Sequence, residues 1–272
     1  MRVRSTTRYS LGSEDHEIAR LDAQAALLER ATGMLLRAAG LVPGMRVLDL
    51  GTGLGHVALA VADLVGAQGR VIGIDSAPKL LQEATRRASA RPQVQFVEGD
   101  VRTWRSRERF DAVVGRLILF HLPDRLEVLR HHVAGLRPGG LVVGLDFDLG
   151  ASRSEPPVPI VAEALEWTTA AFLSAGACPT IGARLAPLLA EAGLVDVQSI
   201  GVQEYLAPDD PRGARILCGV MRSLAPHAAA AGIATPEHLR YETLEERLTA
   251  AMVASASSLL FPVLSCAWGR GR

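Results

Sequence analysis

Residues 47–56 read VLDLGTGLGH, and this stretch constrains the fold more than any other part of the chain. An apolar run that contains Asp49 leads into three alternating glycines. Glycines between a strand and a helix let the backbone pass close to a ligand, which then faces the helix N-terminus. A dinucleotide fingerprint needs G-x-G-x-x-G, and here His56 stands where the third glycine would fall. The turn therefore predicts a small-molecule site that departs from the dinucleotide pattern.

Helix and strand patterns alternate on both sides of this turn. Apolar spacing predicts a helix over residues 14–40, ended by Pro43 and Gly44. Strands are expected at 46–50, 70–74, 94–97, 111–114 and 141–146, with helices at 57–64, 78–88 and 124–136, the last one ending at RPGG. The strands are continuous apolar runs, as expected when helices cover both faces of a parallel sheet. The pattern predicts an α/β fold with a Rossmann-like, doubly wound, mostly parallel sheet.

The regular alternation of strand and helix patterns ends after residue 150. SEPPVP at 154–159 reads as a linker, and helical patterns follow at 160–173, 184–192, 212–224 and 237–256, with late strands at 195–205 and 263–268. We interpret 1–272 as a single domain in four parts. These are an N-terminal helical lid (1–40), a cofactor-binding core (41–150), a helical cap over an acceptor pocket (151–180 and 207–256), and segments that complete the sheet (181–206 and 257–272).

Composition excludes several functional classes. Lys plus Arg equals Asp plus Glu at 29 each, so no overall field favours nucleic acid or an anionic membrane. No apolar run approaches the roughly 20 residues that span a bilayer, and no signal peptide is recognisable. The three cysteines are widely separated without a CxxC pair, which favours a cytoplasmic protein without disulfides. Lys79 is the only lysine, which disfavours pyridoxal, Walker-type and Tyr-x-x-x-Lys chemistry.

Three carboxylates accompany the glycine turn. Asp75 ends the second strand, where a carboxylate accepts both hydroxyls of a ribose. Asp100 follows the third strand, in reach of an adenine amino group, and Asp49 precedes the glycines, where it suits a cationic ligand. The loop itself has no cation for a pyrophosphate. These residue types predict a pocket for a cationic adenosine, which means a sulfonium nucleoside.

Five motifs occur in a characteristic order: VLDLGTGLGH, GRVIGIDSAPKLL, VQFVEGDV, FDAVVGRLILFHLPD and LRPGGLVV. With them the chain resembles the class I S-adenosylmethionine-dependent methyltransferases, firmly over about residues 41–148. The segment EIARLDAQAALLERATGMLLRAAGL and the ending SCAWGRGR resemble small-molecule members from actinobacteria. The resemblance implies the seven-stranded fold of that family, S-adenosyl-L-methionine as cofactor and S-adenosyl-L-homocysteine as product.

The resemblance also implies roles for individual residues. The three glycines would approach the methionine part of the cofactor, Asp75 and Ser76 would hold and flank the ribose, and Asp100 and Val101 would border the adenine. Arg116 and Gln24 would lie at the sulfonium end, or else make ordinary surface or inter-helix contacts. The expected cofactor-binding set is Asp49, Gly51, Thr52, Gly53, Gly55, Asp75, Ser76, Asp100, Val101, Arg116 and Gln24.

Candidates for catalysis lie at the carboxyl ends of later strands. Methyl transfer needs alignment and exclusion of water, and a base only where the nucleophile must lose a proton. His121 follows strand four and is either a base or a packing residue. Asp146 and Asp148 share one face of strand five and either act as base, bind an amine or shape the pocket. A DxD metal site lacks a clear third ligand, so no metal is expected.

The sequence thus favours methylation of an apolar or aromatic small metabolite at oxygen, nitrogen or carbon, with a place in natural product biosynthesis. GRLI after strand four differs from the N/D-P-P-Y turn that grips a nucleobase, so no nucleic acid partner is expected. A homodimer is compatible with the apolar terminal helices. Two alternatives remain: a cofactor-binding protein with a non-methylating or regulatory role, and an NAD(P)-dependent oxidoreductase. Aromatic residues expected to line the cap are Trp167, Phe172, Phe120, Phe147 and Tyr9.

Overall fold

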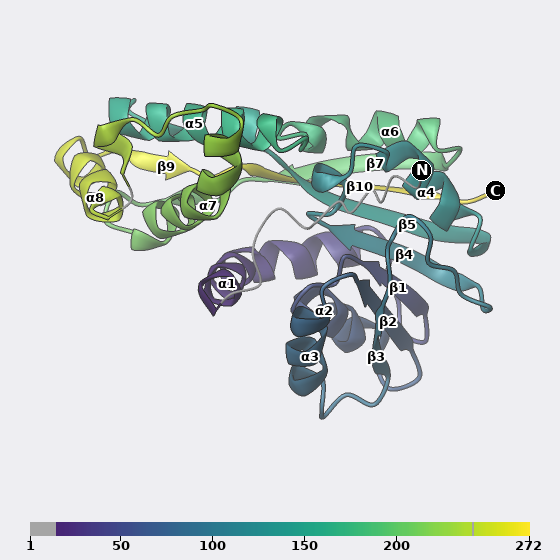
Figure 1. The fold of residues 1–272 in the computed structure, drawn as a ribbon. Coiled ribbons are helices and arrows are strands. Elements are labelled where there is room, and N and C mark those ends of the chain that lie inside the picture. Colours follow the sequence, from purple (N-terminus) through teal and green to yellow (C-terminus); the bar gives the residue numbers. More distant parts are fainter. Residues whose placement is uncertain (1–14, 241) are drawn as a thin grey trace, which may run out of the picture.

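A computed structural model describes residues 15–240 and 242–272, so Tyr9 lies outside the described residues. Its centre is a seven-stranded sheet of order β3-β2-β1-β4-β5-β10-β7 (Figure 1). The strands are β1 (Arg46–Leu50), β2 (Arg70–Asp75), β3 (Val94–Glu98), β4 (Phe110–Arg116), β5 (Leu136–Asp148), β7 (Val195–Val202) and β10 (Val263–Arg270). All neighbours pair in parallel except β10, which runs antiparallel to both β5 and β7. The predicted fold class is confirmed.

Helices cover the sheet because its central strands are apolar on both faces. Helix α2 (His56–Val65) packs on β1 and β2, and α3 (Pro78–Arg87) packs on β2 and β3. On the other half of the sheet, α4 (Arg125–Val133) packs on β5, while α6 (Leu185–Glu191) packs on β7 and β10. Residues of β1, β4 and β5 such as Val47, Val114 and Leu145 are fully buried. Their burial fixes the carboxyl ends of β1 and β4 side by side, where the glycine turn begins.

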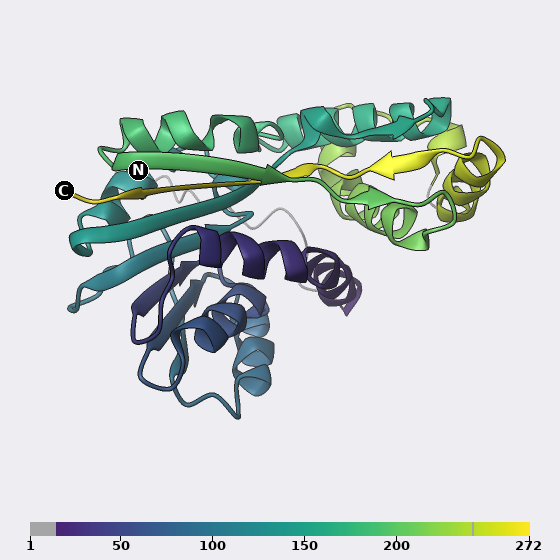
Figure 2. The same cartoon turned by 180° about the vertical axis from the view of Figure 1, so that it is seen from behind.

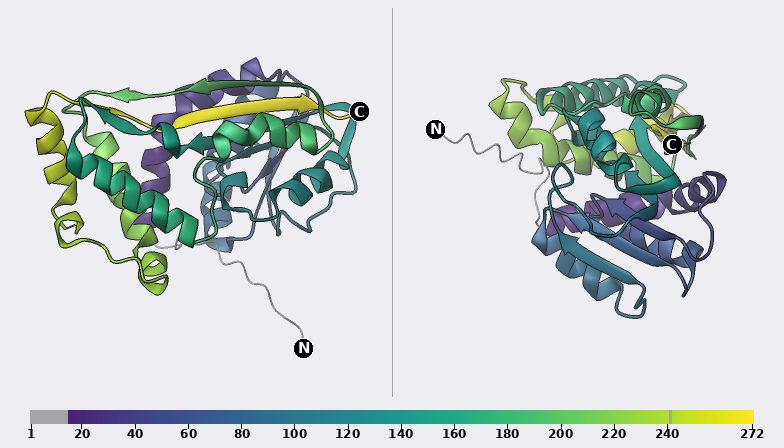
Figure 3. Two further views of the ribbon diagram at one scale, coloured as in Figure 1. Left: turned by 90° about the horizontal axis from the view of Figure 1, so that it is seen from above. Right: turned by 90° about the vertical axis from the view of Figure 1, so that its right-hand side faces the viewer.

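A cap stands beyond the carboxyl ends of the strands (Figures 1 and 3). It contains α5 (Pro159–Ser174), α7 (Pro211–Ala230), α8 (Leu244–Ala254) and a three-stranded sheet of order β6-β9-β8. These strands are β6 (Arg153–Glu155), β9 (Ser258–Leu260) and β8 (Tyr205–Leu206). Helix α1 (Asp15–Ala38) lies between the cap and the core, in contact with both α2 and α7 (Figure 2).

The structure differs from expectation at two places. β5 begins at Leu136, so RPGG lies within that strand rather than before it, where the pairing with β4 shifts register between Phe110 and Ala112. The cap sheet was not predicted, and its central strand β9 lies in a range that we expected to complete the main sheet. Strands of two or three residues carry no periodicity of their own, and here they form only by pairing across the chain.

Among the residues that the structure describes, no helix is both long and apolar enough to cross a membrane.

Candidate functional site

The glycine turn leaves β1 in a backbone conformation that favours glycine. Gly51 has φ +63° and Gly53 has φ +52°. A Cβ on Gly51 would come within 2.7 Å of the Ile118 side chain, so that position needs glycine for the fold itself. A Cβ on Gly53 would meet no protein atom within 4 Å. Gly53 therefore faces open space, and its backbone is free to approach a ligand.

Asp75 holds this turn from the neighbouring strand. Its Oδ2 accepts a hydrogen bond from the Gly53 amide at 2.9 Å, and its Oδ1 accepts one from the Ala77 amide at 2.9 Å. The side chain is buried, and burial raises the pKa of its carboxyl against the lowering effect of these amides. The carboxylate at the end of β2 thus orders the backbone of the turn.

A second buried carboxylate lies under the turn. Asp49 accepts a hydrogen bond from the Thr52 hydroxyl at 2.6 Å, and burial raises its pKa to about 7. Arg116, at the end of β4, opposes this shift through its charge. Its guanidinium donates to the Thr32 hydroxyl at 2.9 Å, and burial lowers the pKa of Arg116 to about 10. The turn is therefore flanked by the buried carboxyl group of Asp49 and the half-buried guanidinium of Arg116.

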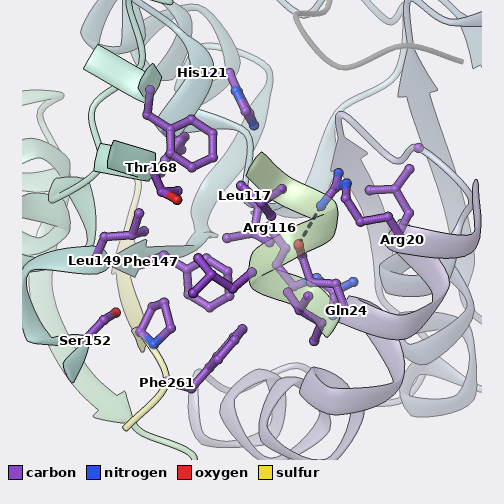
Figure 4. A pocket seen from close by; sticks show the side chains of 18 of the residues that line it. Arg20, Gln24, Arg116, Leu117, His121, Phe147, Leu149, Ser152, Thr168 and Phe261 are labelled. Carbon is purple, nitrogen blue, oxygen red and sulfur yellow. Dashed lines mark hydrogen bonds between the residues drawn. The ribbon is translucent and has the colours of Figure 1, made fainter. Parts of the chain in front are cut away.

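One cavity joins this turn to the cap (Figure 4). From the core it is lined by the turn itself and by Arg116 and His121, and from α1 by Gln24. The predicted residues that it brings together are Gln24, Gly51, Thr52, Gly53, Arg116 and His121. They come from three separate stretches of the chain, so their convergence agrees with a shared ligand site.

The opposite walls of the cavity are apolar and aromatic. Phe147 and Phe261 meet edge to face with ring centroids 5.6 Å apart, and Phe120 and Phe172 do so at 4.8 Å. All four side chains line the cavity. Of the aromatic residues that we expected here, Phe120, Phe147 and Phe172 are in place, whereas Trp167 does not line the cavity and donates instead to the Ala234 carbonyl at 3.2 Å.

Several predicted site residues lie outside the lining of this cavity. Asp75 does not line the cavity but hydrogen-bonds the amide of Gly53, which does. Gly55 lies directly before helix α2. The exposed Asp100 accepts a hydrogen bond from the Arg102 amide at 2.8 Å, and the carbonyl of the buried Val101 lies 2.7 Å from His132 Nε2. The residues concerned are Asp49, Gly55, Asp75, Ser76, Asp100, Val101, Asp146 and Asp148. The ribose and adenine candidates therefore lie outside the lining of the described cavity.

The two aspartates of β5 are placed differently from what their sequence position suggested. Asp146 is fully buried, and burial raises its pKa well above the ordinary value. Asp148 Oδ1 accepts a hydrogen bond from the Gly150 amide at 3.0 Å, which caps a short helical turn. Between them Phe147 points into the cavity, because successive side chains of a strand alternate between its faces. The structure therefore brings the aromatic residue, and neither carboxylate, to the cavity.

His121 does reach the cavity, from a short 3₁₀ helix after β4 (Leu119–His121). Burial, together with the charge of Arg20, lowers its pKa to about 4. Its imidazole is therefore neutral near pH 7. A neutral imidazole can accept a proton, and a pKa of about 4 makes His121 a weak base near pH 7.

The residues of the cavity wall that the sequence analysis did not predict include Arg20, His56, Ser152 and Phe261. Arg20 was recognisable in principle, since it lies four residues before Gln24 and donates to it at 2.9 Å. His56 binds Asp22 of α1 at 2.9 Å, and Arg87 of α3 binds the same carboxylate at 2.6 Å. Ser152 and Phe261 carry no local signal, because the small cap sheet alone brings them to the cavity.

Within residues 15–240 and 242–272, no group of three or more His, Cys, Asp or Glu side chains is arranged to hold a metal ion.

Comparisons with known proteins agree with this geometry. Residues 47–140 match the family model described as a methyltransferase domain. The trans-aconitate 2-methyltransferase of Escherichia coli (strain 55989 / EAEC) is 38% identical over 96 residues, which is 35% of this chain and 36% of that protein. The chain thus matches only about a third of the length of such curated relatives.

Solved structures show the same fold over most of the chain. A methyltransferase-like protein from Bacillus halodurans C-125 aligns with a TM-score of 0.56 at 18% identity, over 88% of this chain and 98% of that one. The Haemonchus contortus phosphoethanolamine N-methyltransferase 2, in complex with S-adenosyl-L-methionine, aligns with a TM-score of 0.56 at 16% identity, over 89% and 52%. Residues 47–140 therefore match a methyltransferase domain, and most of the chain shares the fold of these solved structures, one of them in complex with S-adenosyl-L-methionine.

Proposed function

We propose that this chain transfers a methyl group from S-adenosyl-L-methionine to an apolar or aromatic small molecule. The observation that supports this most is a single cavity, lined at one end by the glycine turn and at the other by two aromatic pairs. A cofactor at the turn and an acceptor among the aromatic rings would share one space, as transfer between them requires.

The residues around the turn suit this cofactor. Gly53 leaves room for a ligand against the backbone, where any side chain would intrude. Asp49 suits the ammonium group of the methionine part, and the half-buried Arg116 suits its carboxylate, since each would gain a counter-charge. Asp75 would hold the ribose, Ser76 would flank it, and Asp100 and Val101 would border the adenine. Gln24 would close the sulfonium end from α1.

When bound, the cofactor supplies an electrophilic methyl group on a positively charged sulfur. The chain has three tasks: it aligns the acceptor, excludes water and accommodates a proton where the nucleophile releases one. Phe147, Phe172 and Phe261 would align the acceptor and exclude water. His121, neutral near pH 7, would take the proton from an acceptor hydroxyl or amine. An acceptor that is already anionic needs no such base.

α1 is proposed as the lid of this cavity. It is tied to the core through Asp22, which contacts His56 and Arg87, and to α7 through Glu17, whose Oε2 accepts from the Ser223 hydroxyl at 3.1 Å. The proposal for the acceptor rests on the cap of this chain. We do not infer trans-aconitate as the acceptor of this chain, because the match to that relative covers only about a third of either protein.

Titration calorimetry with S-adenosylhomocysteine tests the cofactor site, with NAD(P)H as the control ligand. We expect tight binding of the nucleoside and a loss of at least tenfold, about 1.4 kcal/mol, in Asp75→Ala. Asp63→Ala, which removes an exposed carboxylate that pairs with Arg91, should leave binding unchanged. Preference for NAD(P)H, or no nucleoside binding at all, would refute the proposal and favour the oxidoreductase.

Turnover separates the proposal from a cofactor-binding protein without methylation. Incubation with S-adenosyl-L-methionine and a panel of phenols, aromatic acids and aromatic amines should give products heavier by one methylene, detected by mass spectrometry. Tight S-adenosylhomocysteine binding without any methylated product across that panel would favour the non-methylating alternative. A role in natural product biosynthesis and a cytoplasmic location belong to the same proposal and depend on the acceptor found.

A further inference from the structure

The cap end of the cavity contains a hydroxyl group that its surroundings do not explain. Ser152 lines the cavity beside Phe147, Leu149 and Phe261 (Figure 4). Its Oγ is closed off from solvent and has no hydrogen-bond partner among the described residues. Buried hydroxyls are nearly always hydrogen-bonded, because an unpaired one gives up its bonds to water without replacement. A serine in this position is therefore unfavourable for the unliganded fold.

A second hydroxyl lies on the same apolar side. Thr168 of α5 is buried and lines the cavity, and its Oγ1 donates to the Ala164 carbonyl at 2.7 Å. Its proton is thus committed to its own helix, and only its lone pairs are left for a ligand. Ser152 is different: rotation about its χ1 breaks no existing bond, and its hydroxyl both donates and accepts.

The position of these hydroxyls relative to the cofactor residues is informative. Figure 4 shows Ser152 and Thr168 on the cap side, with Phe147 between them and Gln24 on α1. The cofactor would lie at the turn and Gln24 end. A group that meets Ser152 would therefore be at the far end of the acceptor from the atom that receives the methyl group.

We propose that the acceptor is an aromatic molecule with a hydroxyl, or another oxygen group that both donates and accepts, at the end remote from the methylated atom, and that Ser152 recognises this group. The inference rests on the proposed function, because it takes the cofactor end of the cavity from it. Ser152 acts as a specificity-determining residue: an acceptor oxygen restores the hydrogen bonds that the folded chain leaves unmade, whereas a methyl group there does not.

Two naphthalene probes of almost equal shape test this directly. 2,6-Dihydroxynaphthalene and 6-methyl-2-naphthol both keep a hydroxyl for the cofactor end and differ only in the remote group. Their dissociation constants are measured by calorimetry on the full chain saturated with S-adenosylhomocysteine. We expect the dihydroxy probe to bind at least tenfold more tightly, well beyond the factor of two that its symmetry contributes.

Substitution of the serine should remove the preference. In Ser152→Ala the two probes should bind within about threefold of each other, and the melting temperature should not fall, because the lost hydroxyl has no partner in the unliganded chain. Ser174→Ala is the matched control. Its hydroxyl donates to the Ala171 carbonyl at 2.8 Å at the end of α5, away from the cavity lining, and it should keep the wild-type preference.

The outcomes separate this inference from the proposed function. Equal binding of the two probes to the wild type, or a preference that persists in Ser152→Ala, would overturn the role of Ser152. Failure of both probes to bind the S-adenosylhomocysteine-loaded chain would overturn the aromatic class of acceptor. Failure of S-adenosylhomocysteine itself to bind would instead count against the proposed function.

Discussion

The glycine turn and the aromatic wall enclose one cavity but are built in different ways. The turn depends on backbone conformation over residues 49–56 and on one carboxylate, Asp75, at the end of the next strand. The wall depends on side chains from β5, α5, α7 and the segment after β9, which are far apart in the sequence. A site made by the backbone restricts residue type locally, whereas a site made by side chains depends on the whole cap being assembled.

The largest effect should come from the wall. Phe147 is buried and packs edge to face on Phe261. Phe147→Ala should lower the free energy of unfolding by about 3 kcal/mol, because it leaves a cavity between core and cap. Chemical denaturation measures this, and S-adenosylhomocysteine binding under native conditions should change by less than about threefold. A large loss of nucleoside binding would contradict the separation of the two regions.

A substitution in the turn should instead weaken nucleoside binding strongly and lower stability only a little. Gly53→Ala places a methyl group where the ligand approaches, and we expect S-adenosylhomocysteine to bind about thirtyfold more weakly, roughly 2 kcal/mol. Gly232→Ala is the matched control, since Gly232 has φ +75° and likewise no atom within 4 Å of a Cβ. Both variants should lose a similar 1 kcal/mol or so of stability from backbone strain. Equal nucleoside binding in both variants would show that Gly53 is not at the ligand.

Opposite pH dependences should distinguish Asp49, under the turn, from His121, at the cavity wall after β4. The pKa of Asp49, ordinarily 3.8, is raised to about 7, so ionisation makes the folded chain less stable as pH rises from 4 to 7. The pKa of His121, ordinarily 6.5, is lowered to about 4, so stability falls as pH drops from 6.5 to 4. These effects oppose each other in the wild type.

Single variants should reveal them. Relative to the wild type, Asp49→Asn should become more stable as the pH rises from 4.5 to 6.5. His121→Gln should become more stable as the pH falls from 6.5 to 4.5. Each difference should change by about 1–2 kcal/mol. Denaturant titrations at the two pH values measure the difference. If the stability of both variants relative to the wild type changed in the same direction with pH, the environments assigned to Asp49 and His121 would be wrong.

The smallest effect concerns the contact that joins α1 to the turn. Asp22 is partly exposed and binds both His56 and Arg87. Asp22→Asn should cost less than about 1 kcal/mol of stability, as partly solvated ion pairs do. S-adenosylhomocysteine binding should weaken only two- to threefold, because α1 lies against the turn but contributes none of its backbone. A tenfold loss would place α1 in the turn site itself.

The core was accessible to sequence analysis because its signals are local. The strand that leads into Gly51 and the strand that ends at Asp75 were expected within a residue of their observed limits. Asp75 and Gly53 do meet, through a hydrogen bond, because parallel strands bring their carboxyl ends to one edge. Alternation along β5 was read correctly, but it could not say which face of the strand met the cavity. The structure turns Phe147 toward it and buries Asp146 away from it.

The sequence by itself therefore determined the α/β core, the glycine turn and the kind of nucleoside that suits it. These depend on spacing within one strand–turn–helix unit and on which residue type each strand ends with. The tertiary structure alone decided the cap sheet, the aromatic pairs and the position of Ser152. Those features arise from pairings between segments far apart in the chain, such as Arg153 with Leu260, and burial of side chains there depends on the assembled fold rather than on any local pattern.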